Sequence, residues 1–321
     1  MHHHAPDRSA THPSAATIWA PLRRFTLGEA RLGRFMAQRP WTGGIYEFFR
    51  FGLKQGWACL FGGIAVMLMI ATWRYYPAAA TLPRYDFLFL CMISVQTALL
   101  ALRMETWEEA KVILIYHAVG TLMEIFKTSV GSWIYPEPNI FRIAGVPLFT
   151  GFMYSCIGSY ICRAWRLFDF RFSHHPPRSG LIALSLAIYA NFFTDHFALD
   201  FRLVLFAAAA VLLFRTKIHF RIWHAYRAMP LLLGFLLVAS FIWLSENIGT
   251  VTKTWLYPSQ HLAWSMVSPA KLGSWFLLVI VSYTLVSLIN APRPLAAEDA
   301  GAQERFADST RAFAQPRDVA R

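Results

Sequence analysis

Two glutamates, Glu124 and Glu246, occur in strongly apolar stretches of the chain, where carboxyl groups are rare. A carboxylate that faced lipid would cost a few kcal/mol, so we expect both side chains to face the interior of a helix bundle. Carboxyl groups in an apolar interior suit general acid/base chemistry or the coupling of a carrier to protons. A buried, hydrogen-bonded pair that only fixes helix packing is the alternative interpretation.

Further polar side chains are expected beside each glutamate, because residues three or four apart share a helix face. His117 and Thr128 share the face of Glu124, and Lys127 is near enough along the helix to form an ion pair with it. Glu124, Glu246 and His117 are the predicted catalytic residues, although a histidine bonded to a neighbouring helix explains His117 equally well. The predicted substrate-binding residues are Lys127, Thr128, Trp133, Tyr135, Asn247, Thr250, Trp255 and Tyr257.

An internal repeat links the two glutamates. When the sequence is shifted by 122 residues, Glu124 aligns with Glu246, and a Trp-x-Tyr-Pro motif at 133–136 aligns with the same motif at 255–258. Seven identities occur over 28 positions without a gap, and several involve rare residue types. We interpret the segment as a duplicated unit of helix, loop and helix, with both copies in the same orientation. Pseudo-symmetric packing of the copies would bring the two carboxyl groups to one cavity.

Eight apolar segments are available to position these residues. They run near 55–73, 86–102, 108–128, 145–163, 180–194, 200–214, 229–250 and 272–291. A membrane-spanning helix needs about 20 residues, so the short fifth and sixth segments are the least secure spans. The predicted fold class is an all-α, polytopic membrane helix bundle of about eight transmembrane helices, with a parallel internal repeat of spans 3–4 and 7–8.

Composition and charge support a membrane protein and exclude a soluble enzyme. The 321 residues are 56% hydrophobic and 15% charged, with a mean hydropathy of +0.40. Soluble domains carry about 25% charged residues. With eight spans, 23 of the 30 Lys and Arg residues fall on one side, which the positive-inside rule assigns to the cytoplasm. The net charge of +12 is then explained by contact with anionic lipid. Nucleic acid is not an expected partner, because no binding module accompanies the charge.

Four regions are predicted along the chain. Residues 1–22 are expected to form a disordered tail and 23–54 a basic amphipathic segment at the membrane interface. The eight-helix membrane domain would extend over 55–292, and 293–321 would form a second disordered tail. The expected location is the bacterial cytoplasmic (inner) membrane, as a multi-pass protein with both termini in the cytoplasm.

The sequence contains no recognisable motif for a metal ion, a nucleotide or another cofactor. The four cysteines form no CxxC pair, and the pair His174–His175 lacks the further ligands that a metal site requires. We therefore expect no metal and no cofactor. Membrane lipid is the expected partner, and the sequence gives no indication of the oligomeric state.

Five motifs carry a resemblance to a known family. They are Glu105–Lys111 (ETWEEAK), Gly131–Pro138 (GSWIYPEP), Arg166–Arg171 (RLFDFR), Ser245–Thr250 (SENIGT) and Lys271–Trp275 (KLGSW). With these motifs the chain resembles, over about residues 48–292, the bacterial integral-membrane family called domain of unknown function 817, or YoaT-like. The resemblance implies a membrane protein and adds no reaction.

A fainter likeness involves Glu124, Tyr135 and the stretch Gly145–Leu148 that opens the next apolar segment. This layout is similar to that of membrane-embedded carotenoid hydratases and small lycopene cyclases. The likeness implies proton-driven chemistry on a polyisoprenoid double bond.

Three functions therefore follow as hypotheses. The first is a membrane-embedded enzyme in which the paired glutamates perform acid/base chemistry on an isoprenoid or another lipid. The second is a proton-coupled secondary transporter of a small solute. The third is a non-catalytic structural membrane protein whose repeat only packs. A cavity lined by both carboxyl groups would favour the first hypothesis, and a closed bundle would favour the third.

Overall fold

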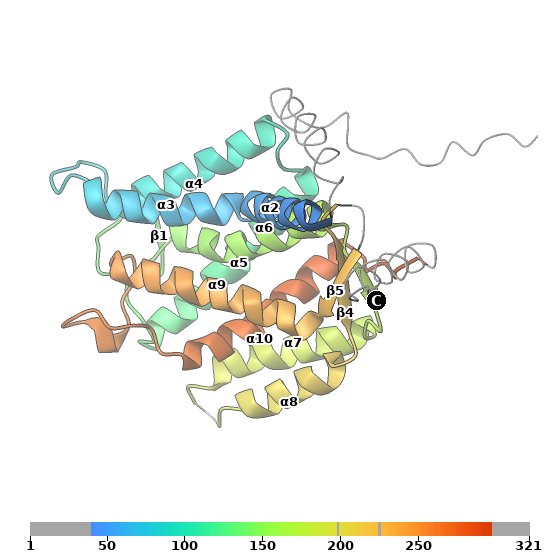
Figure 1. Ribbon diagram of the computed structural model, residues 1–321. Coiled ribbons are helices and arrows are strands. Elements are labelled where there is room, and N and C mark those ends of the chain that lie inside the picture. The colour runs from blue at the N-terminus through green and yellow to red at the C-terminus, as the bar shows by residue number, and fades with distance from the viewer. Residues whose placement is uncertain (1–39, 198, 224–225, 297–321) are drawn as a thin grey trace, which may run out of the picture.

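The structure, a computed structural model, describes residues 40–197, 199–223 and 226–296. Within these ranges nine α-helices run roughly side by side through the molecule (Figure 1). They are α2 (Pro40–Ala58), α3 (Leu60–Tyr75), α4 (Arg84–Ala101), α5 (Trp107–Ser129), α6 (Phe149–Phe168), α7 (Arg178–Thr194), α8 (Arg202–Leu213), α9 (Leu231–Val251) and α10 (Ala270–Ile289). A short 3-10 helix, η1 (Pro258–Gln260), precedes α10.

Each of the eight predicted apolar segments contains a helix, α3 to α10 in order. The start of the fourth segment was predicted too early, because α6 begins at Phe149 rather than near residue 145. The preceding residues form a tight hairpin of β1 (Arg142–Ile143) and β2 (Val146–Pro147). Gly145 in the turn has a φ of +82°, a left-handed conformation that glycine adopts without strain.

Three of the described helices, α4, α9 and α10, are long and apolar enough to cross a membrane. The helices α2 and α3 pass the same test as a pair, but a bend of 69° separates Thr42–Ala58 from Leu60–Tyr75. The described chain thus holds three candidate spans, or four with the bent pair. Large apolar side chains such as Leu114, Leu186 and Leu203 are exposed on the outside of the bundle. An apolar exterior of this kind is typical of a protein surrounded by lipid.

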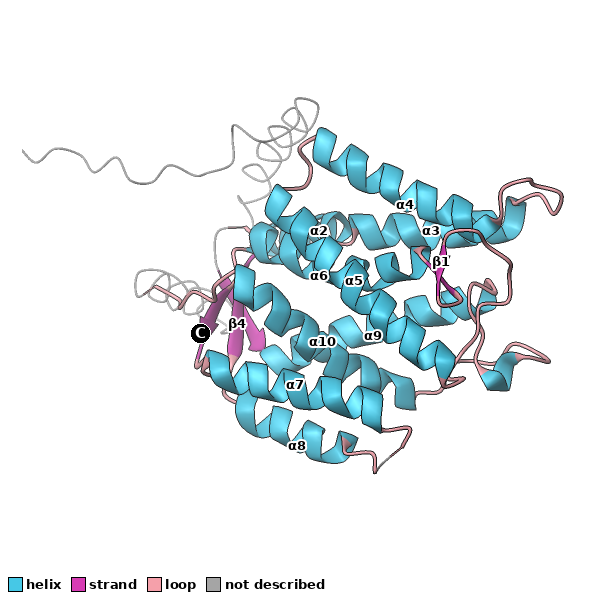
Figure 2. Ribbon diagram, turned by 180° about the vertical axis from the view of Figure 1, so that it is seen from behind, coloured by secondary structure: helices cyan, strands magenta, loops and turns pink. Residues whose placement is uncertain are grey.

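A small antiparallel sheet closes one end of the bundle, and the β1–β2 hairpin lies at the other end (Figure 2). The sheet has the order β3 (Arg171–Ser173), β4 (Lys217–Arg221) and β5 (Tyr226–Pro230). Asp169 accepts hydrogen bonds from the Arg221 guanidinium and the Tyr226 hydroxyl, which ties the start of the sheet to its other strands. The all-α prediction therefore holds for the bundle but missed these short strands, which lie between the apolar segments.

The helices α5 and α6 approach each other closely because glycine occupies the contact. A Cβ atom at Gly120 would lie 2.6 Å from the ring of Tyr154, and one at Gly158 would lie 2.9 Å from the ring of Tyr116. Small residues at such contacts let membrane helices pack backbone against backbone. The start of α5 is fixed by a capping box between Thr106 and Glu109. The close α5–α6 contact brings Tyr154 beside the end of α5 that carries Glu124.

Candidate functional site

Glu124 accepts three hydrogen bonds, and its side chain is buried. One carboxylate oxygen, Oε2, accepts from Trp133 Nε1 at 2.7 Å and from the hydroxyl of Tyr135. The other oxygen, Oε1, accepts from the hydroxyl of Tyr154 at 2.8 Å. Trp133 and Tyr135 follow α5 in the chain, whereas Tyr154 comes from α6. The three donors give the buried carboxylate the partners that it would otherwise lose with water.

Glu246, on α9, has a similar but smaller set of donors. Its Oε1 accepts from the hydroxyl of Tyr257, and its Oε2 accepts from Trp275 Nε1 at 2.7 Å. Tyr257 follows Glu246 by 11 residues, which is also the separation of Tyr135 from Glu124. The tryptophan donor differs, because Trp133 comes from the loop after its own helix and Trp275 comes from α10. Each glutamate thus accepts from one tyrosine of the following loop and from one tryptophan.

The two Trp-x-Tyr-Pro motifs contact each other directly. Ile134 N–H donates to Leu256 O at 2.9 Å, and Leu256 N–H donates to Ile134 O at 3.0 Å, which forms an isolated antiparallel bridge. The rings of Trp133 and Tyr257 meet edge to face with their centroids 6.0 Å apart. This contact joins a donor of Glu124 to a donor of Glu246. The two carboxylates therefore belong to one connected network.

Lys271 adds a positive charge to this network. Its Nζ lies 4.7 Å from the centroid of the Tyr257 ring and 5.3 Å from that of the Trp133 ring. An ammonium group over aromatic faces is attracted by the ring quadrupole. Burial and the neighbouring carboxylates raise the pKa of the Tyr135 and Tyr257 phenols well above their usual range. Both phenols therefore keep their protons and act as hydrogen-bond donors.

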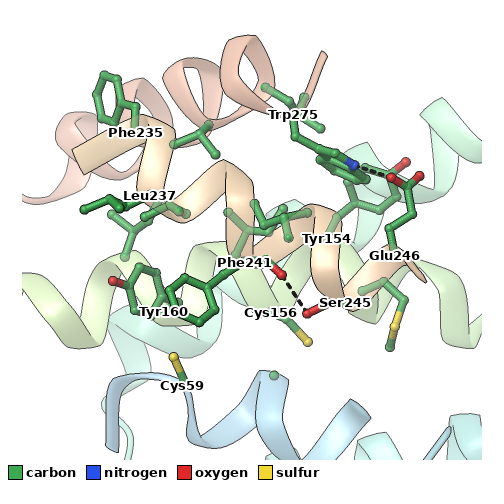
Figure 3. A pocket seen from close by; sticks show the side chains of 18 of the residues that line it. Cys59, Tyr154, Cys156, Tyr160, Phe235, Leu237, Phe241, Ser245, Glu246 and Trp275 are labelled. Carbon is green, nitrogen blue, oxygen red and sulfur yellow. Dashed lines mark hydrogen bonds between the residues drawn. The ribbon is translucent and has the colours of Figure 1, made fainter. Parts of the chain in front are cut away.

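Both glutamates line a single cavity of about 1490 Å³. The rest of its wall is mostly apolar and comes from α2, α3, α6, α9 and α10. Figure 3 shows Glu246 and Trp275 at one end of the view, and Cys59, Tyr160 and Phe241 around the apolar part. Along α6 the lining extends from Thr150 to Phe168, a length of about 27 Å at 1.5 Å per residue. The site thus combines a long apolar chamber with two hydrogen-bonded carboxylates.

Several residues predicted from the sequence meet at this cavity. Besides the two glutamates, the lining includes Lys127, Trp133, Tyr135, Trp255 and Tyr257. Lys127 does not pair with Glu124, however, because its Nζ lies 2.8 Å from Asp195 Oδ1 of the segment after α7. The predicted ion pair with Glu124 is therefore wrong, since a partner distant in sequence reaches the lysine and three other donors occupy the glutamate.

Four predicted site residues do not line the cavity. His117 contacts the ring of Phe152, with ring centroids 4.5 Å apart, and packs against Gly151 of α6. Thr128 is also absent from the lining. Asn247 accepts a hydrogen bond from Val267 N–H, and Thr250 accepts one from Trp264 Nε1, so both brace the segment before α10. His117, Asn247 and Thr250 thus contact other parts of the protein instead of the cavity.

Three important residues were missed. Tyr154 and Trp275 donate to the glutamates from α6 and α10, and Lys271 covers the two aromatic rings. Lys271 and Trp275 lie in the KLGSW motif quoted for the family resemblance, so a signal was present in the sequence. Tyr154 carries no such signal, since only the close packing at Gly120 brings it to Glu124.

Comparison with known proteins identifies the family. The family described as "Protein of unknown function (DUF817)" matches residues 47–283. This chain belongs to that family. An "Uncharacterized protein YoaT" of Bacillus subtilis (strain 168) is 37% identical over 262 residues, which cover 82% of this chain and 98% of the relative. The family resemblance seen in the sequence motifs is thus confirmed.

Solved structures give a more distant likeness. A mycobacterial Insig homolog, MvINS from Mycobacterium vanbaalenii, matches with a TM-score of 0.42 at 13% sequence identity. The match covers 60% of this chain and 98% of that one, and a cross-linked trimer of a cysteine variant of MvINS matches to the same extent.

Proposed function

We propose that this protein is a membrane-embedded enzyme that acts on an isoprenoid or another lipid with a long apolar chain. The observation that carries the proposal is the joint placement of Glu124 and Glu246 on one large, mostly apolar cavity. The apolar wall would hold the chain of the substrate and exclude water, while the carboxyl groups would meet its reactive part. A structural protein has no need for a cavity of this size.

The proposed chemistry is proton transfer. One carboxyl group of the pair delivers a proton to a substrate double bond, and the other removes a proton from the resulting cation. The tyrosine and tryptophan donors hold both carboxyl groups in fixed positions, and this supports the proposed transfer. Lys271 offsets part of the negative charge of the pair. His117, predicted as a third catalytic residue, has no part in the proposal.

We further propose the architecture of a multi-pass protein of the bacterial inner membrane, with eight spans and both termini in the cytoplasm. The ion pair of Lys127 with Asp195 joins the end of α5 to the end of α7. The pairing of β3 with β4 joins the start of α7 to the segment after α8. These contacts support a hairpin of α7 and α8 that enters and leaves on one side. The charge in α6 is compatible with a span, because Arg163 is buried and pairs with Glu105.

The parallel repeat is part of the same proposal. The residues that form the isolated bridge, Ile134 and Leu256, are 122 positions apart and therefore equivalent in the repeat. A pair of equivalent residues facing each other is expected where a two-fold axis passes between two copies. The matching Glu–Tyr hydrogen bonds at equal spacing support the same interpretation.

The predicted interfacial segment, 23–54, is only partly described. Residues 23–39 and the predicted tail 1–22 lie outside the described residues, as does 297–321 of the second tail. The part that is described belongs to α2, which meets α3 at the 69° bend. Lys54 Nζ donates to the carbonyls of Leu167 and Arg221, next to the sheet. These contacts support an α2 that lies along the cytoplasmic surface of the bundle.

A proton-coupled carrier is the second candidate. The observation in its favour is the extent of the cavity, whose lining continues along α6 from the glutamates toward the sheet. A carrier would take up a solute into sealed vesicles under a pH gradient, and this uptake would require Glu124. A lipid-modifying enzyme would change the composition of a lipid extract without any gradient.

The experiment that tests the enzyme hypothesis compares lipid and pigment extracts from a deletion strain that carries the wild-type gene, E124Q or E246Q. Loss of a catalytic carboxyl should reduce the conversion by about 10²-fold or more. The matched control is E108Q, which removes an exposed carboxyl from the same helix as Glu124. Folding is followed by thermal unfolding of the purified variants. Extracts that match in all strains, across lipid and pigment classes, would exclude the enzyme.

A further inference from the structure

A second cavity, of about 340 Å³, lies at the end of α10 beside the three-stranded sheet. Its walls come from the loop before α7, from the first residues of α7, from the end of α10 and from the segment 291–294. The residues that give it its character are His174, His175, Arg178 and Arg293. This cavity shares no lining residue with the one that contains the glutamates.

Hydrogen bonds connect the walls of this basic pocket. Arg178 Nη2 donates to Leu288 O at 2.9 Å, which joins the start of α7 to the end of α10. Phe172 N–H donates to Arg293 O at 2.9 Å, which joins the last segment to the sheet. His175 Nε2 lies 2.9 Å from the hydroxyl of Tyr283. The pocket is therefore built from segments that hold one another in position.

The pocket is positively charged and contains no acidic side chain in its lining. Several other arginines at this end of the molecule have carboxylate partners: Arg163 pairs with Glu105, Arg171 and Arg221 with Asp169, and Arg227 with Glu47. In the described part of the chain Arg178 and Arg293 form no such pair, whereas Arg171 and Arg221 of the neighbouring sheet both pair with Asp169. Their charge is thus open to a ligand.

We propose that this pocket binds a phosphate group, either of an anionic phospholipid headgroup or as free phosphate. Guanidinium groups bind phosphate oxygens with two parallel hydrogen bonds, and a neighbouring imidazole such as His174 adds a donor. The pocket follows directly on α10, a candidate membrane span that ends at Ile289. Lipid headgroups lie at this depth, and basic pockets between membrane helices bind them. The proposal does not depend on the function of the larger cavity.

The test measures lipid binding by the full-length protein in detergent with native mass spectrometry. Phosphatidylglycerol and phosphatidylcholine with the same acyl chains are titrated separately, and inorganic phosphate is then added as a competitor. The variants are R178A/R293A and, because Arg178 also bonds the end of α10, R293A alone. The control R215A/K217A removes the same charge from exposed residues outside the pocket lining.

The wild type should bind phosphatidylglycerol at least tenfold more tightly than phosphatidylcholine. R178A/R293A should bind phosphatidylglycerol about tenfold more weakly than the wild type does. The single variant should lose part of it, and the control should keep it. Competition by inorganic phosphate would identify free phosphate as a ligand of the same site, whereas no competition would identify the lipid headgroup. Equal binding of the two lipids without competition by inorganic phosphate, or equal losses in the variant and the control, would overturn the proposal.

Discussion

At the scale of single residues, the site depends on hydrogen bonds to buried carboxylates. Tyr154 donates the hydrogen bond that Oε1 of Glu124 accepts. Y154F should therefore destabilise the protein by about 1.5–3 kcal/mol, the usual range for a hydrogen bond to a charged group. Thermal unfolding in detergent measures this effect. The control is Y189F on α7, because the Tyr189 hydroxyl has no hydrogen-bond partner among the described residues. Equal melting temperatures for both variants would contradict the geometry.

At the scale of elements, glycine sets the distance between α5 and α6. Even a methyl group at Gly120 would come within 2.6 Å of the Tyr154 ring. G120A should push the helices apart, lower stability by about 1–3 kcal/mol and weaken the bond from Tyr154 to Glu124. G63A on α3 is the matched control, because a Cβ there meets nothing within 4 Å. This control should be neutral or slightly stabilising, since alanine favours a helix. Unfolding curves of the two variants decide the question, and a harmless G120A would show that the helices are not in tight contact.

The elements and the site differ in how far the sequence predicts them. Apolar segments located all eight helices from α3 to α10, because hydrophobic runs mark helices of a membrane protein directly. The repeat identified Glu124, Tyr135 and their counterparts, since it marks the same positions twice. Helical periodicity assigned His117 and Thr128 to the helix face of Glu124. It could not identify the residues that contact this face, because they are decided by packing between helices. The donors Tyr154 and Trp275 come from such neighbours and could not be derived from spacing within one helix.

At the scale of the whole molecule, contacts at the two ends of the bundle restrict the topology. Because β3 pairs with β4, residues 171–173 and 217–221 must lie on the same side of the membrane. Since α7 and α8 connect these strands, both helices cross or neither does. The pairing of Lys127 with Asp195 favours crossing, because it links the far end of α7 to the end of α5. The 12 residues of α8 are too few for a straight span of about 20 residues, so this pair is the critical part of the topology.

Single cysteines test the topology in vesicles of known orientation. The four native cysteines are first replaced, and cysteine is introduced at Asn139, Leu199 or Lys217. Leu199 and Lys217 are exposed, and Asn139 is partly exposed. A membrane-impermeant maleimide should label N139C and L199C in right-side-out vesicles, and K217C only in inside-out vesicles. Labelling after detergent treatment confirms that each thiol reacts. If L199C were labelled from the same side as K217C, the α7–α8 pair would not cross the membrane, and the chain would have six spans. Labelling of both N139C and L199C from the outside would instead require α6 and α7 each to cross the membrane. The short helix α8 would then cross back, where the bilayer is locally thinner.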